Sequence, residues 1–309
     1  MKNQLIGTSR ENNIVLLGSQ GPFVFFYGFS FLRLDGYIGN PAFEYYSLLT
    51  KQSIYETFTI MFNYIRKETD KSKREVLLNY VRGYLNGYAF SRNTQPFIYY
   101  FGGYEKSDSP WDTYSLARYS LETKLDILYE QSIRESTTFK SIFRISKEDL
   151  SVISEMFYNL AIDVYSLMMI TKKTFSDSYH EMRNRLAISN NESGFLFGVF
   201  LKLLKKEQVN VFMRGKRVED TDKFDFLNLR KKKWQHPSEG FEIDITFLDL
   251  VEEAKEEIPF INSILKNLKA GKDVDRALLE FCMNLNYCGF PINSEPSFFD
   301  DVPLERKDD

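Results

Sequence analysis

The stretch SKEDLSVISEMFYNLAIDVYSL (residues 146–167) decides the fold class. Its apolar residues recur at alternating spacings of three and four, as on one face of an α-helix: Leu150, Ile153, Phe157, Leu160, Val164 and Leu167. Ser146 with Asp149 forms a capping pair at the start. The sequence therefore predicts a long helix over 147–173. Its apolar face needs a partner, which is either another helix of the same chain or the same helix of a second copy in a homodimer.

Outward from this helix, the chain is predicted to be mostly helical with β structure at two places. Asn13–Leu17 and Phe23–Leu34 are β-branched and aromatic runs separated by Gly18 and Gly21, which indicates a hairpin. Glu239–Phe247 alternates apolar and polar residues, and Lys223–Leu229 is a shorter strand candidate. The predicted fold class is α+β, predominantly α-helical, with an N-terminal hairpin and a small antiparallel β meander near residues 208–247.

This reading divides the 309 residues into five segments. They are an N-terminal β hairpin (1–36), a helical domain (37–207), a basic β meander (208–247), C-terminal helices (248–292) and a mobile acidic tail (293–309). The tail includes residues 297–304, SFFDDVPL, which resemble the acidic, proline-containing tip of bacterial single-stranded-DNA-binding proteins. That resemblance implies a docking peptide for a protein partner.

Composition excludes several kinds of site. With two histidines and two cysteines, a histidine-rich metal centre, a zinc site and a disulfide scaffold are all excluded, and we expect no cofactor. Cys282 and Cys288 are expected to be buried free thiols. The apolar run Phe23–Leu32 is shorter than the about 20 residues that a membrane helix needs. We therefore expect a cytoplasmic protein that does not enter the membrane.

Charge is distributed unevenly along the chain. Between Lys202 and His236 there are 11 basic residues against 5 acidic ones, whereas residues 237–309 hold 7 against 17. In the basic stretch, cations stand beside an indole that is suited to stacking on an unpaired base. The candidate nucleic-acid-binding residues are Arg214, Lys216, Arg217, Arg230, Lys231, Lys232, Lys233 and Trp234. The alternative is that these lysines only protect strand edges from pairing with other chains.

A second motif lies at Arg183-Asn184-x-x-Ala187. It resembles the Arg-Asn-x-x-Ala-His segment of the HEPN superfamily, whose helical and often dimeric domains occur in ribonuclease toxins and phage-defence systems. In that family the arginine and the histidine cleave RNA without metal, but here Ile188 occupies the histidine position. The resemblance therefore implies an inactive, RNA-binding or scaffolding relative of bacterial or phage type.

A third motif consists of Glu242 and Asp244. Their i, i+2 spacing on an alternating strand places both carboxylates on one side, where they could share a Mg²⁺ ion that clamps phosphate oxygens. This is the alternative hypothesis, a metal-dependent nuclease or nucleotidyltransferase. A third hypothesis is a structural, oligomer-forming protein. The sequence favours a non-catalytic protein that binds RNA or single-stranded DNA.

Overall fold

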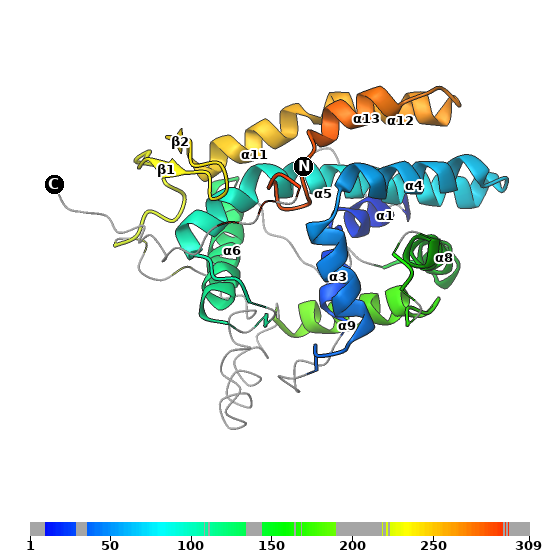
Figure 1. Ribbon diagram of the computed structural model, residues 1–309, viewed down its shortest axis with the longest axis horizontal. Coiled ribbons are helices and arrows are strands. Elements are labelled where there is room, and N and C mark those ends of the chain that lie inside the picture. Colours follow the sequence, from blue (N-terminus) through cyan, green and yellow to red (C-terminus); the bar gives the residue numbers. More distant parts are fainter. Residues whose placement is uncertain are drawn as a thin grey trace. The chain divides into compact units, whose positions relative to one another are not determined.

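The computed structural model describes residues 10–28, 36–107, 109–110, 112–133, 144–163, 165–167, 169–189, 218, 221, 223–292, 294 and 296, with the backbone alone for 187–189. This part of the chain is helical with one two-stranded sheet (Figure 1), which confirms the predominantly α-helical α+β class. The elements in chain order are α1 (Arg10–Gly18), α2 (Phe23–Phe26), α3 (Pro41–Lys51), α4 (Ile54–Lys67), α5 (Lys71–Gly102), α6 (Thr113–Ser132), α8 (Lys147–Asp163), α9 (Thr174–Ser189), β1 (Trp234–Gln235), β2 (Glu242–Ile243), α11 (Phe247–Glu256), α12 (Ile258–Lys269) and α13 (Asp275–Cys282).

The chain divides into two compact units, each assembled from segments that are far apart in the sequence. The first unit comprises Met1–Arg92, Lys140–Arg185 and Ala254–Ile292, and the second comprises Asn93–Phe139, Leu186–Glu253 and Asn293–Asp309. Helix α5 contributes residues to both units, since the division falls between Arg92 and Asn93.

Aromatic rings build the core of the first unit. Phe157 of α8 stacks on Phe175 of α9 with ring centroids 4.9 Å apart, and Phe25 of α2 meets Phe157 edge-on at 5.0 Å. Tyr80 of α5 also packs edge-on against Phe157, at 5.7 Å. Such pairs contribute about 0.5–1.5 kcal/mol each beyond the apolar area that they bury. The abundance of aromatic residues therefore serves the core, where they join α2, α5, α8 and α9.

Helix α8 is an internal helix. Its apolar face is buried by the chain itself, with Leu150, Ile153, Phe157 and Leu160 all less than 5 % exposed. The Ser146 hydroxyl accepts a hydrogen bond from the Asp149 N–H, so the predicted cap is present. For these four residues the partner is the chain itself, as the first alternative predicted, and a homodimer through 147–173 stays a prediction. The helix also ends at Asp163 rather than 173, and Ser166 has a φ of 52°, which a right-handed helix does not accommodate.

The predicted N-terminal hairpin is wrong, because α1 and α2 occupy this region. Gly18 is not a turn residue but a contact between helices. A Cβ on Gly18 would lie 2.0 Å from the Tyr80 carbonyl oxygen of α5, and a Cβ on Gly83 would lie 2.0 Å from the Val15 oxygen of α1. The glycines let the two backbones touch, and this tertiary contact outweighs the strand propensity of the β-branched residues.

The second unit contains the sheet. Strands β1 and β2 pair antiparallel, with Trp234 opposite Ile243. Within the described residues, this pair is the part of the predicted meander that forms strands. Lys223–Leu229 forms turns with a single bridge residue at Phe224, and 208–217 lies outside the description. Strand β2 is short because Thr246 and Asp249 form a reciprocal cap, with N–H to side-chain oxygen distances of 2.9 and 3.0 Å, which starts α11.

Candidate nucleic-acid interface

Residues 228–233, called the basic loop below, lead into β1 and are held from inside by two polar side chains. The Asn228 side chain donates to the carbonyls of Lys232 (2.9 Å) and Ile245 (3.2 Å) and accepts from the Lys232 N–H (2.9 Å). The Asp225 carboxylate accepts from the Arg230 N–H at 2.8 Å. Asn228 is 1 % exposed and Asp225 is 8 % exposed. The backbone of the loop is therefore fixed, while the basic side chains from Arg230 to Lys233 are exposed.

Lys231 has a strained backbone. Its φ is 52°, in the left-handed region that glycine and asparagine tolerate and that costs a lysine about 1 kcal/mol or more. The surrounding hydrogen bonds to Asn228 hold this conformation in place. Strain of this kind persists where the structure over-determines it, and it clusters at functional sites.

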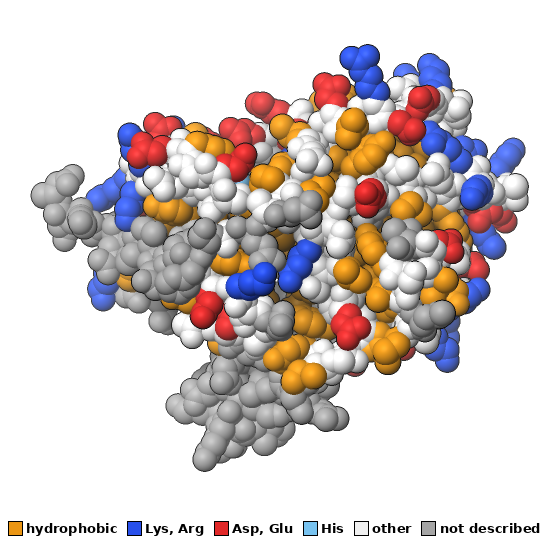
Figure 2. Space-filling model, in the orientation of Figure 1, with side chains coloured by type: hydrophobic (Ala, Val, Ile, Leu, Met, Phe, Trp, Pro, Cys, Tyr) orange, Lys and Arg blue, Asp and Glu red, His pale blue; other side chains and the backbone are white. Residues whose placement is uncertain are grey.

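Carboxylates lie beside Lys231 and Lys233. The Lys233 ammonium is 3.0 Å from Glu242, and the Lys231 ammonium is 3.6 Å from Asp249. The hydrogen bond that Lys233 donates to the Glu242 carboxylate raises the pKa of Lys233 above its ordinary value. Both lysine side chains are more than half exposed, so these pairs are weak and are screened by salt. Figure 2 likewise shows acidic and basic side chains next to one another on the face in view.

Trp234 does not offer a stacking surface, and the prediction that it stacks on a base is wrong. Its side chain is 1 % exposed and meets the ring of Phe97 edge-on at 5.5 Å. The indole N–H donates to the Ile245 carbonyl at 3.2 Å. A buried tryptophan with a satisfied N–H is a core residue. It anchors the basic loop to the C-terminal part of α5.

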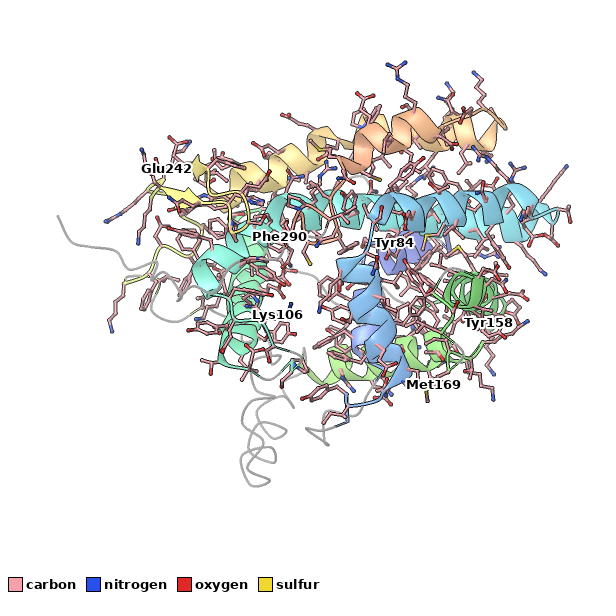
Figure 3. The ribbon with its side chains drawn as sticks, in the orientation of Figure 1. Tyr84, Lys106, Tyr158, Met169, Glu242 and Phe290 are labelled. Carbon is pink, nitrogen blue, oxygen red and sulfur yellow. The ribbon has the colours of Figure 1, made fainter. Side chains whose placement is uncertain are left out.

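Glu242, labelled in Figure 3, lies on β2, Asp244 directly follows the strand, and both are exposed. The predicted alternation is incomplete, because Phe241 is exposed as well. Glu242 already pairs with Lys233, and this ammonium would compete with a metal ion for the same carboxylate. Among the described residues no group of three or more His, Cys, Asp or Glu side chains is placed to hold a metal. Cys282 is buried and Cys288 half-buried, and both are free thiols.

The remaining predicted residues fall in different places. Arg214, Lys216 and Arg217 lie outside the described residues, as does the 297–304 segment. Arg183 and Asn184 lie on α9, where the Arg183 guanidinium sits over the Tyr179 ring, 5.7 Å from its centroid. The side chain of Ile188, at the position of the HEPN histidine, is not described. The HEPN resemblance therefore stays a prediction.

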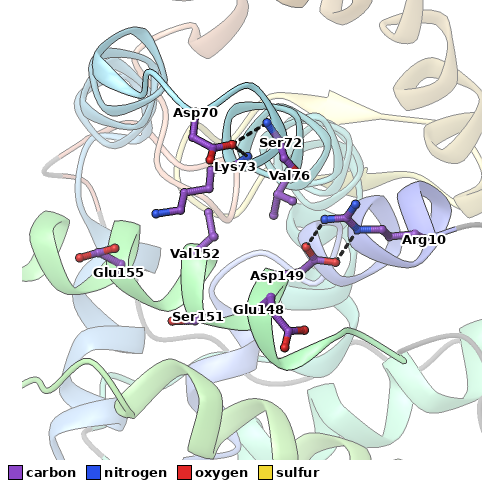
Figure 4. A pocket seen from close by; sticks show the side chains of 10 residues that line it. All are labelled: Arg10, Asp70, Ser72, Lys73, Val76, Glu148, Asp149, Ser151, Val152 and Glu155. Carbon is purple, nitrogen blue, oxygen red and sulfur yellow. Dashed lines mark hydrogen bonds and ion pairs between the residues drawn. The ribbon is translucent and has the colours of Figure 1, made fainter.

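A shallow pocket of about 340 Å³ lies in the first unit, between the start of α5, the start of α8 and Arg10 (Figure 4). Two of its carboxylates are bound by the protein: Arg10 binds both oxygens of Asp149, and Asp70 caps α5 through the N–H groups of Ser72 and Lys73. The Arg10 hydrogen bond holds the pKa of Asp149 below its ordinary value. This arrangement ties α1 to α8.

The residues that the sequence reasoning missed are Asn228 and Asp225, which shape the basic loop. The sequence did contain a signal for them, because asparagine and aspartate side chains form hydrogen bonds to backbone groups a few residues away in turns.

Comparison with known proteins adds nothing to these observations, since no family model, curated protein or solved structure matches the chain. Within the described part of the chain, no helix is long and apolar enough to cross a membrane.

Proposed function

We propose that the protein binds RNA or single-stranded DNA through the basic loop, Arg230 to Lys233, and that it has no catalytic centre of its own. One observation carries this proposal: the Asn228 hydrogen bonds hold four consecutive exposed cations on a fixed backbone, with Lys231 kept in a strained conformation. A loop that is already ordered loses little entropy when a strand binds. The role of the loop is electrostatic, since the adjacent Trp234 is buried.

The nearby carboxylates modulate this interaction. A phosphate would replace Glu242 beside Lys233 and Asp249 beside Lys231, and it would exchange an exposed, weak pair for another ion pair. If all four cations neutralise one phosphate each, log K should fall against log salt with a slope of about −2.8.

Fluorescence anisotropy with labelled single-stranded RNA and DNA tests the proposal. Replacing Lys231, Lys232 and Lys233 with alanine should flatten the salt slope by about 2 and leave melting nearly unchanged. The matched control is Lys172→Ala with Lys173→Ala, two exposed lysines of the first unit, which should change neither. Absence of salt-sensitive binding by the wild-type protein refutes the proposal.

Glu242→Gln separates binding from catalysis. Removing this carboxylate frees Lys233, so we expect tighter binding of the oligonucleotide. In a metal-dependent nuclease or nucleotidyltransferase the same change would abolish an activity that EDTA also abolishes. Loss of such an activity in Glu242→Gln would establish the enzyme and exclude the proposed function.

The HEPN resemblance is proposed to reflect a non-cleaving, RNA-binding relative, and the setting in phage defence rests on that resemblance alone. We expect no metal-independent RNA cleavage by the wild-type protein, because Ile188 has no proton to transfer. Cleavage that disappears in Arg183→Ala would show that another residue supplies the acid.

A further inference from the structure

Helices α5 and α12 of the first unit line a groove of about 470 Å³. Each helix contributes one face with the spacing i, i+3, i+4 and i+7. The lining residues are Glu75, Leu78, Asn79 and Arg82 from α5, and Asn262, Leu265, Lys266 and Lys269 from α12. Leu78 and Leu265 are buried and form an apolar floor, whereas the charged side chains are exposed along the sides. The volume falls in the range of small-molecule sites, about 300–1,000 Å³.

Asn79 contributes the neutral polar group of this groove. It is 8 % exposed and lines the groove beside Leu78. Its side-chain amide can donate hydrogen bonds to a ligand that binds there.

The charge of the groove is positive. Arg82 and Lys266 are exposed and make no ion pair with another described residue, whereas Lys269 binds Glu75 at 2.6 Å. The lining therefore holds three cations and one carboxylate. Lys266 and Lys269 also lie in the last turn of α12, where cations stabilise the helix dipole. That stabilisation explains the lysines but not Arg82.

We propose that this groove binds the phosphate of a nucleotide, either free or within a nucleic-acid strand. Arg82 and Lys266 pair with the phosphate oxygens, and the Asn79 amide donates to the same ligand. The leucine floor takes the apolar face of the sugar or base. This site is independent of the basic loop, which belongs to the other unit, and either proposal survives the failure of the other.

The test measures binding of three probes to the full chain: inorganic pyrophosphate, a fluorescent adenosine diphosphate, and a single-stranded oligonucleotide. The oligonucleotide arm uses the variant in which Lys231, Lys232 and Lys233 are alanine, so that the basic loop does not contribute. Replacing both Arg82 and Lys266 with alanine should weaken binding about tenfold or more, as expected for lost charge-assisted hydrogen bonds. The pair Lys172→Ala and Lys173→Ala is again the matched control.

Two further variants should change the affinity in opposite directions, which a purely structural role of these side chains would not predict. Asn79→Leu should weaken binding while the protein stays folded, because a leucine side chain cannot donate a hydrogen bond to the ligand. Glu75→Gln should tighten binding, since it frees Lys269 and removes the negative charge.

Binding of pyrophosphate or the diphosphate identifies a free nucleotide as the ligand, and binding of the oligonucleotide alone identifies a strand. In each case the probe must bind at least about tenfold more weakly to the variant in which Arg82 and Lys266 are alanine. If no probe binds saturably at low salt, or if the double variant binds as the wild-type protein does, the groove is not a phosphate site.

Discussion

Replacing Trp234 with alanine separates a core residue from a base-stacking residue. Because the side chain is 1 % exposed, truncation should leave a cavity between β1 and the C-terminal part of α5. Large-to-small changes of buried aromatic residues cost about 3–5 kcal/mol of unfolding free energy. The Ile245 carbonyl also loses its indole donor. We therefore expect a loss of about 3–5 kcal/mol, with unchanged salt dependence of oligonucleotide binding under conditions where the variant is folded.

Trp234→Phe is the graded control. It keeps most of the ring volume but removes the N–H that bonds to Ile245, so it should cost about 1–2 kcal/mol. The chain has two tryptophans, and Trp111→Phe makes the fluorescence report on Trp234 alone. In that background the emission should be blue-shifted, and it should shift to the red when urea unfolds the second unit.

Urea unfolding is followed by circular dichroism for every variant, and by this fluorescence for the protein that keeps Trp234. Oligonucleotide binding is measured for each folded variant. If Trp234→Ala leaves the unfolding midpoint unchanged and instead weakens oligonucleotide binding by about 1–3 kcal/mol, the indole is a stacking surface. The burial argument would then be refuted.

Three other predictions follow from buried polar groups. The Tyr84 hydroxyl is buried without a hydrogen-bond partner in the described structure, so Tyr84→Phe should be neutral or stabilising in urea unfolding, whereas Tyr45→Phe should cost about 1 kcal/mol because it removes a donor to a backbone carbonyl. The pKa of Asp149 is lowered beside Arg10, so this pair stabilises the fold above about pH 3.8, and the contribution disappears as pH falls through the folded-state pKa. Asp149→Asn should therefore reduce the loss of unfolding free energy at acid pH. Burial raises the pKa of Glu122 to about 7, so its ionisation should destabilise the fold progressively between about pH 4.5 and 7, and Glu122→Gln should remove that slope and stabilise the protein above pH 7.

Helical periodicity made much of this fold predictable. The apolar face of α8 and its cap at Ser146 are where the spacing of residues 146–160 places them. The N-terminal helices were missed because the same residue types, β-branched and aromatic, also suit strands. What decides between the two is the contact of Gly18 with Tyr80 and Gly83, which no local pattern contains.

The candidate site was predictable only in part. Exposure of Arg230 to Lys233 follows from their charge, and the structure agrees. The burial of Trp234 was not predictable from its basic neighbours, because it depends on Phe97, a residue from a distant part of the chain. The backbone hydrogen bonds of Asn228 likewise require the conformation of the loop to be known.

The net charge of a sequence segment also differs from the net charge at the surface where a ligand would bind. The basic loop and the acidic residues Glu242 and Asp249 belong to opposite sides of one hairpin and its following helix, so Lys233 lies next to Glu242 and Lys231 next to Asp249. Because these carboxylates already neutralise part of the loop, a strand that binds there displaces fewer counterions than the sequence count implies. A measured salt slope shallower than about −2.8, made steeper by Glu242→Gln, is the signature that this pairing predicts. A slope that Glu242→Gln leaves unchanged would mean that the strand does not contact Lys233.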